Sequence, residues 1–220
     1  MPSGVVLGMD SNGTMDFGGG PLTSAGSDDV FLARLDHDGG HVWSYNAGDV
    51  EAQWAPRLAA TADGGVVASG SFMGTLGTFP DPIVSAGSMD VYVARLDGNG
   101  LPVWGRRFGD EAWQSPEFIA VDGLGRVLLT GSTSGVIDLG GGALPWGGAE
   151  DLWMAVLDGG GEHVWSFAAG DEAYQSGMGI AADPTGGFFV TGLFEGTLDL
   201  GAGPLVSAGE GDVFVAKLAP

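Results

Sequence analysis

Three short segments of this chain carry a carboxylate and an amide at a fixed spacing, a pattern that could bind a ligand. In each segment an aspartate follows a glycine, and a glutamine comes four residues after the aspartate. An aromatic residue precedes the glutamine in two segments, and Trp54 follows it in the first. The candidate binding residues are Asp49, Gln53, Asp110, Trp113, Gln114, Asp171, Tyr174 and Gln175. Because aromatic rings beside hydrogen-bonding groups commonly hold sugars, one hypothesis is a carbohydrate site in each copy.

The same residues also suit a structural role. An aspartate after glycine can accept hydrogen bonds from its own turn, and a buried glutamine can bond to backbone groups of a neighbouring strand. Packing alone would then make the motif recur. We favour this interpretation over ligand binding.

A second set of acidic residues opens four similar apolar segments. These residues are Asp29, Asp90, Asp151 and Asp212. Clustered oxygens would suit a hard cation such as calcium, but one aspartate in every 61 residues spreads them apart. We therefore expect each to bond to nearby loop amides. Residues 36–39, Asp-His-Asp-Gly, begin like a calcium-binding loop, but no glutamate closes it, and we expect a turn there.

Other catalytic chemistry lacks a supporting pattern. The three histidines, His37, His41 and His163, are scattered and do not form a zinc-binding pattern. There is no Gly-x-Ser-x-Gly elbow for a serine nucleophile, and the glycine-rich loops lack the lysine and following helix of a phosphate site. Among the 28 acidic residues no pair stands out for glycoside hydrolysis. We expect neither enzyme activity nor a cofactor or metal.

Composition and net charge limit the classes of partner that this protein could bind. Hydrophobic residues make up 44% of the 220 residues, enough for a core, and 43 glycines indicate many tight turns. A net charge of -21 makes nucleic acid and anionic membrane surfaces poor partners. No apolar segment is long enough to insert in a bilayer, and residues 1–4, Met-Pro-Ser-Gly, do not begin a signal peptide. Without cysteine, disulfide and thiol chemistry are excluded.

A repeat of 61 residues organises these segments. Its marker is a Gly-Thr-Leu-Asp-Leu-like sequence that begins at Gly13, Gly74, Gly135 and Gly196. Each repeat predicts four short strands separated by turns. The first strands are expected at 58–62, 118–122 and 180–183, the second at 66–70, 127–131 and 188–192, and the third at 29–35, 90–96, 151–157 and 212–218, while Trp43, Trp104 and Trp165 lie on the fourth.

These strands predict an all-β fold of the β-propeller type. Short antiparallel strands that are apolar on both faces suit sheets covered on each side by neighbouring sheets, and helical periodicity is missing. The pattern gives fourteen strands in four blade positions of about 61 residues, of which the first and last are incomplete. We expect one partial propeller domain, residues 1–220, with repeats at 13–73, 74–134, 135–195 and 196–220 plus 1–12.

The recurring blocks resemble a known family. The Val-x-x-Thr-Gly strand, the Gly-Thr-x-Asp-Phe-Gly-Gly-Gly loop, the Asp-Val-Phe-Val-Ala-Lys-Leu strand and the terminal Trp strand resemble the bacterial β-propeller repeats known as SBBP. The resemblance implies a propeller in a bacterial surface-associated protein, used for adhesion or scaffolding, without a common enzyme activity. Residues 7–10, Leu-Gly-Met-Asp, depart from the Thr-Gly at 130–131 and 191–192. We expect this strand to pack or end differently.

The expected function is a non-enzymatic scaffold or interaction module, extracellular or on the bacterial cell surface, with a protein or glycan partner. The alternative is a multivalent lectin with one weak site in each blade. Three arrangements would cover the incomplete blades: the chain closes alone as a small ring, two copies complete a ring, or the chain is part of a longer array.

Overall fold

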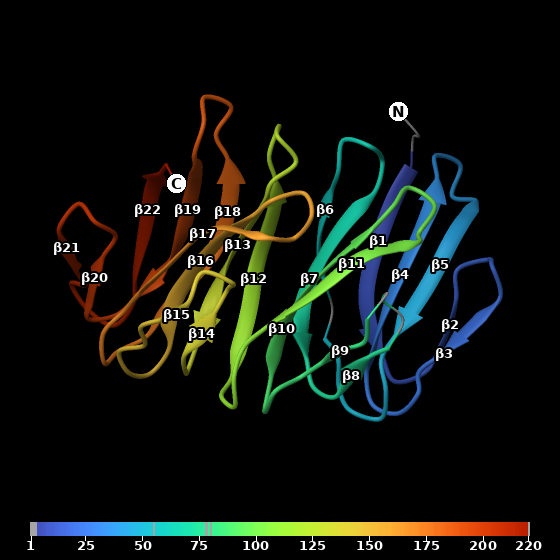
Figure 1. The fold of residues 1–220 in the computed structure, drawn as a ribbon, viewed down its shortest axis with the longest axis horizontal. Helices are drawn as coiled ribbons and strands as arrows, with labels where there is room; N and C mark the ends of the chain where they lie inside the picture. The colour runs from blue at the N-terminus through green and yellow to red at the C-terminus, as the bar shows by residue number, and fades with distance from the viewer. Residues whose placement is uncertain (1–3, 55, 78, 80, 220) are drawn as a thin grey trace. The chain divides into compact units, whose positions relative to one another are not determined.

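The fold consists of strands and turns. The computed structural model describes residues 4–54, 56–77, 79 and 81–219, and these contain no helix (Figure 1). The expected all-β class is therefore confirmed.

Fourteen longer strands form four antiparallel sheets, as expected. The first sheet contains β1 (Gly4–Ser11), β4 (Asp29–Asp36) and β5 (His41–Ala47). The second contains β6 (Arg57–Ala60), β7 (Val66–Phe72), β10 (Asp90–Leu96) and β11 (Pro102–Phe108). The third contains β12 (Gln114–Val121), β13 (Val127–Thr133), β16 (Asp151–Leu157) and β17 (His163–Ala169). The fourth contains β18 (Gln175–Ala182), β19 (Phe188–Phe194) and β22 (Asp212–Leu218).

Two first strands begin earlier than expected. Strands β12 and β18 start at Gln114 and Gln175, so these glutamines belong to strands and not to the preceding connection. In the second sheet, Gln53 forms an isolated bridge with Phe72 ahead of β6. The expected boundary was wrong because a polar glutamine beside an acidic turn was assigned to the loop.

The connection between the second and third strands, for which no strand was expected, contains a small hairpin in each repeat. The hairpins pair β2 (Thr14–Asp16) with β3 (Pro21–Thr23), β8 (Thr75–Leu76) with β9 (Ile83–Val84), β14 (Ile137–Asp138) with β15 (Ala143–Leu144), and β20 (Thr197–Asp199) with β21 (Pro204–Val206). An aspartate closes the turn in three of them. The Oδ1 atom of Asp16 accepts hydrogen bonds from the N–H groups of Gly18 and Gly20, at 2.8 and 3.1 Å. Asp138 and Asp199 bond to the equivalent glycines.

The chain forms two compact units, and each contains a core between two sheets. The first unit comprises Met1–Ser85 with Val91–Arg107, and the second Ala86–Asp90 with Phe108–Pro220. In the first unit, Val30 and Leu32 on β4 pack against a set of side chains from the second sheet that includes Phe72 and Tyr92. In the second unit, Leu152 and Met154 on β16 occupy the same positions. They pack against the fourth sheet, where Phe188, Val190, Phe194 and Phe214 are buried.

The departure at the start of the chain has a local cause. A Cβ atom at Gly131 would overlap the carbonyl oxygen of Ser115 on β12, and one at Gly192 would overlap that of Ser176 on β18. Among the described residues, no strand lies on that side of β1, so Met9 fits at the equivalent position. Strand β1 itself pairs with β4 over all eight of its residues. Gly8, at the position of Thr130 and Thr191, also lacks the hydroxyl with which these threonines donate to the Trp153 and Phe214 carbonyls. The expected difference therefore concerns these two positions and does not shorten the strand.

Candidate functional site

The recurring aspartate and glutamine come together in every copy of the motif. In the first copy, Asp49 Oδ1 accepts hydrogen bonds from the Glu51 N–H at 2.9 Å and from Gln53 Nε2 at 3.2 Å. Its Oδ2 accepts the Thr75 N–H at 2.7 Å, which ties the turn to the start of β8. One carboxylate thus holds its own turn and the hairpin that follows the next strand.

The other copies repeat this geometry. Asp110 accepts hydrogen bonds from the Ala112 N–H at 2.8 Å and from Gln114 Nε2 at 2.7 Å. Asp171 accepts them from the Ala173 N–H at 2.9 Å, Gln175 Nε2 at 2.8 Å and the Thr197 N–H at 2.7 Å. The bond from Ala173, supported by those from Thr197 and Gln175, lowers the pKa of Asp171. The Asp171 carboxylate is therefore held in the charged form by its own loop.

The glutamine amides are buried and used inside the loop. Gln53, Gln114 and Gln175 are fully buried. Besides its bond to Asp171, Gln175 Nε2 donates to the Glu195 carbonyl at 2.8 Å, and its Oε1 accepts the Asp171 N–H at 3.1 Å. Because both N–H groups of the amide have partners in the protein, no donor of Gln175 points to a ligand in this arrangement. The geometry favours the structural interpretation.

The aspartates that open the third strands bond to loop amides, as expected. One oxygen of each accepts a backbone N–H from the residue four positions earlier. The donors are Ala25 for Asp29 at 3.0 Å, Ala86 for Asp90 at 2.5 Å, Gly147 for Asp151 at 2.6 Å and Ala208 for Asp212 at 2.6 Å.

The second oxygen of these aspartates explains the glycine of the motif. A Cβ atom at Gly48 would overlap both Asp29 Oδ1 and Gln53 Oε1, so only glycine fits there. Its Cα–H group faces these two acceptors, an arrangement typical of weak C–H···O contacts. Burial, opposed by the Ala25 hydrogen bond and reinforced by the charge of Asp49, raises the pKa of Asp29. The motif is therefore a four-residue network that includes an aspartate from the preceding strand.

Sequence reasoning treated Asp29 and the Gly-Asp-Gln segment as separate sets. The two sets are in fact linked in every copy, since Gly109 contacts Asp90 and Gly170 contacts Asp151 in the same way. A signal was available, because each aspartate precedes its glycine by nineteen residues.

The aromatic residues of the motif are only half-buried. Trp113 and Tyr174 are intermediate in exposure, and their backbones form bridges with Met89 and Glu150. The Trp113 carbonyl accepts the Ser134 N–H at 2.9 Å. Within the predicted sugar site, solvent thus still reaches the aromatic residues and the aspartates, whereas the glutamines are buried.

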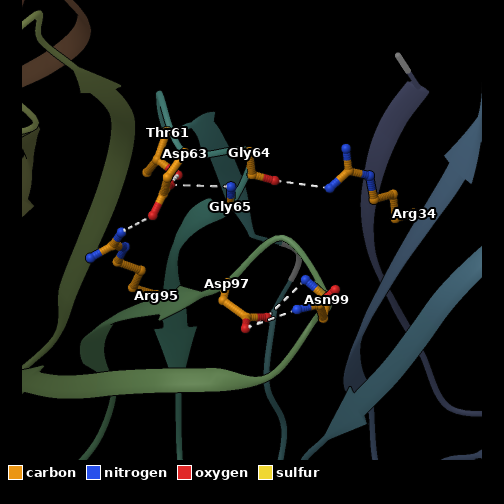
Figure 2. Close-up of polar contacts among 8 residues, drawn as sticks. All are labelled: Arg34, Thr61, Asp63, Gly64, Gly65, Arg95, Asp97 and Asn99. Atoms are coloured by element: carbon orange, nitrogen blue, oxygen red, sulfur yellow. Dashed lines mark hydrogen bonds and ion pairs between the residues drawn. The ribbon is translucent and has the colours of Figure 1, made fainter. Parts of the chain in front are cut away.

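A buried arginine was missed by sequence reasoning. Arg34 on β4 is 7% exposed, and its Nη1 donates to the carbonyls of Gly64 at 2.9 Å and Gly98 at 3.0 Å. Figure 2 shows the side chain directed from β4 toward the turn that contains Gly64. Trp43 Nε1 also donates to the Gly98 carbonyl, at 3.3 Å. The first sheet thereby holds the two turns at one end of the second sheet.

Further polar contacts stiffen these two turns. Asp63 accepts hydrogen bonds from the Thr61 hydroxyl and from Arg95 Nη2, both at 2.5 Å (Figure 2). The Thr61 bond, followed by that from the Gly65 N–H, lowers the pKa of Asp63. In the other turn, Asp97 Oδ1 accepts the Asn99 N–H at 2.8 Å. A cavity of about 340 Å³ adjoins this cluster, lined by Gly4, Val6, Arg34, Leu58, Ala60, Thr61, Gly64, Gly65 and Val66.

The histidines and the segment 36–39 have structural partners. Asp36 Oδ1 accepts the N–H groups of Asp38 and Gly40, at 2.9 and 2.7 Å, so the segment forms the expected turn. His37 and Asp38 beside it are exposed. His41 lies against Gly19 of the β2–β3 turn, and His163 lies in the same way against Gly141 of the β14–β15 turn.

Comparison with known protein-family models and with curated proteins finds no match. The part of the chain described by the structure includes no helix of the length and apolarity needed to cross a membrane. The strand pairing of the described residues identifies an all-β protein in which a sheet of three or four long antiparallel strands occurs four times.

Proposed function

We propose that this chain is a β-propeller repeat module of the SBBP type that acts as a non-enzymatic scaffold or interaction protein at or outside a bacterial cell surface. The observation that carries the proposal is the network of Asp29, Gly48, Asp49 and Gln53, which recurs in three copies. Catalysis usually requires one distinctive polar set, whereas here the recurring polar side chains hold their own loops. This pattern supports a module built for repetition.

The packing within each unit supports a propeller. In both units the same positions of the third strand, Val30 and Leu32 in one and Leu152 and Met154 in the other, pack against the following sheet. Repeats of this kind are stabilised by burying their faces against neighbours, so three-stranded first and last sheets favour completion by further sheets. A second copy of the chain is the partner to test first. Light scattering should give about 44 kDa for a dimer, and 22.2 kDa would reject it.

The structural role of the network is tested by stability. If Gln175 holds its loop, Gln175→Ala should lower the free energy of unfolding while the protein still folds. The reason is that the Asp171 carboxylate and the Glu195 carbonyl lose the amide donor of Gln175. A variant with unchanged stability would contradict the proposal.

The half-exposed Trp113 and Tyr174 favour the lectin as a second candidate. A glycan array, with and without calcium, tests it directly. Binding that is lost in Trp113→Ala would support a sugar site, and no signal on any glycan would reject the lectin.

A further inference from the structure

Strand β22 is an edge strand with a free side. It pairs with β19 from Asp212 opposite Phe194 to Leu218 opposite Phe188. In the described part of the chain, no strand pairs with its other side, whereas β4, β10 and β16 each have strands on both sides (Figure 1). An edge of this kind presents unpaired backbone N–H and carbonyl groups that can pair with another strand.

Elsewhere in the chain, strands equivalent to β22 have this edge covered by a further strand. Strand β4, Asp-Val-Phe-Leu-Ala-Arg-Leu-Asp, differs from β22, Asp-Val-Phe-Val-Ala-Lys-Leu, at only two of the seven shared positions. Strand β5 covers β4, with Ala47 opposite Val30, Tyr45 opposite Leu32 and Trp43 opposite Arg34. Strand β17 covers β16 with the same spacing of Ala169, Phe167 and Trp165.

The exposure of β22 matches a missing cover. Val30 and Leu32 of β4 are 3% and 2% exposed, because they pack against the second sheet beside the covering strand β5. The equivalent Val213 and Val215 of β22 are 69% and 73% exposed, and among the described residues no strand covers this edge. The neighbouring β20–β21 hairpin is open too, with Val206 71% exposed. At the equivalent place in the first sheet, Asn46 Nδ2 of β5 donates to the Thr23 carbonyl at 3.1 Å. The hairpin and the edge of β22 thus form one continuous surface for a strand.

One residue of the hairpin sets a selectivity rule. His41 of β5 and His163 of β17 occupy the space beside Gly19 and Gly141, where any Cβ atom would overlap the imidazole ring. The equivalent residue in the fourth sheet is Ala202, which carries a Cβ atom. A histidine packed in that way would therefore overlap this Cβ atom and have to turn away, which disfavours histidine as the first residue of an incoming strand. Proline is an alternative first residue, because Pro102 begins β11.

We propose that the outer edge of β22, with the β20–β21 hairpin, binds an extended segment of a partner polypeptide by antiparallel strand pairing. The register of β4 and β5 places a tryptophan of this segment opposite Lys217, an aromatic residue opposite Val215 and an alanine opposite Val213. Main-chain hydrogen bonds supply affinity, and alternate side chains supply specificity. The inference deepens the proposed interaction role. It can fail separately, because light scattering reports the pairing of two copies, whereas peptide binding reports strand addition at this edge.

A labelled peptide tests the inference. The probe is Gly-Pro-Val-Trp-Ser-Tyr-Asn-Ala-Gly, which carries the β5 sequence with proline in place of His41. Fluorescence anisotropy should show saturable binding to the full chain. The control peptide exchanges the valine and the tryptophan, which moves the large ring to the opposite face, and should bind at least about tenfold more weakly. The peptide that keeps histidine should also bind more weakly than the proline peptide.

Matched protein variants place the site. Val215→Asp should weaken binding at least about tenfold, since the pair with the aromatic residue is lost. Val50→Asp, at a 71% exposed position of the first unit, should bind like the parent chain. Both positions are exposed, and thermal unfolding confirms that each variant folds. Amide shifts in an NMR titration should concentrate on β20, β21 and β22.

Three results would overturn the inference. They are equal binding of both peptides, absence of binding up to about 1 mM, or unchanged binding by Val215→Asp. Light scattering on the same samples tests whether a second copy of the chain, and not a partner peptide, occupies this edge. A dimer that Val215→Asp converts to monomer, together with no peptide binding, would assign the edge to a second copy of the chain.

Discussion

The two units solve the same packing problem with different chemistry at one position of the third strand. In the first unit this position is Arg34, which donates to carbonyls of two turns in the second sheet. In the second unit the equivalent position is Val156, which is fully buried among apolar side chains. The neighbouring tryptophan changes partners as well. Trp43 donates to the Gly98 carbonyl, whereas the Trp165 ring packs 5.6 Å from that of Phe188.

The difference between arginine and valine follows from the groups that the adjoining sheet presents to this position. The second sheet has a turn between β10 and β11 whose Gly98 carbonyl accepts a hydrogen bond from Arg34. Val156 instead packs among apolar side chains that include Phe188 and Val190 of the fourth sheet. A buried guanidinium without acceptors would be strongly destabilising, and valine avoids this desolvation. The residue type at this repeated position therefore depends on the groups packed against it and differs from one repeat to another.

Placing an arginine in the second unit should have the largest effect. Val156→Arg buries a charge among apolar side chains such as Phe188 and Val190, and we expect a loss of about 3–5 kcal/mol in the free energy of unfolding. Urea unfolding measures it, with Val156→Met as the apolar control, for which overpacking should cost about 1–3 kcal/mol. Equal stability of the two variants would show that turn carbonyls do not explain the comparison.

Removing the arginine from the first unit should have a smaller effect. Arg34→Met keeps most of the apolar stem but leaves the Gly64 carbonyl without this donor, so we expect a loss of about 1.5–3 kcal/mol. Hydrogen exchange should show faster opening of the turn at 61–65. If the loss were confined to the second unit, the assigned contact would be wrong.

The glutamine network should behave alike in both units, which sharpens the contrast. Gln53→Ala and Gln175→Ala each remove an amide that bonds to its aspartate and to a backbone carbonyl. We expect similar losses of about 1–3 kcal/mol, measured by urea unfolding. A large difference between the two variants would mean that the networks are not equivalent.

The smallest effect concerns Lys217, which holds the position of Arg34 in the fourth sheet. Its ammonium, followed by the Thr185 N–H and hydroxyl, lowers the pKa of Asp183 from 3.8 to about 2. The stabilisation is therefore present above about pH 4 and lost as the pH falls toward 2. In Lys217→Met, an NMR titration should place the pKa of Asp183 closer to 3.8. An unchanged value would assign the shift to Thr185 alone.

Much of this fold could be predicted from the sequence because its long strands carry strong apolar patterns and clear turns. The small hairpins were missed, since strands of two or three residues such as Thr75–Leu76 give no periodic signal. The start of β12 at Gln114 was also missed, because burial of an amide depends on partners that the local sequence does not identify.

The candidate site was predictable in its residues but not in its contacts. The aspartates and glutamines were found by their spacing, while their role depends on distances that only the folded chain provides. The burial of Arg34 could not be predicted from the sequence, because arginine is rarely buried and its two acceptors lie 30 and 64 residues away. The proposed propeller ring, the resemblance to SBBP repeats and the surface location stay predictions.

The exchange of glycine for Met9 bears on how this protein would tolerate redesign. A consensus obtained by averaging the four repeats would place glycine at this position and at 70, 131 and 192 alike. Gly131 and Gly192 are constrained by the backbone of an adjacent first strand, and Gly70 by the Tyr92 side chain and the Trp54 carbonyl. Of these four positions, position 9 is thus the one at which the described chain accepts a side chain larger than that of glycine.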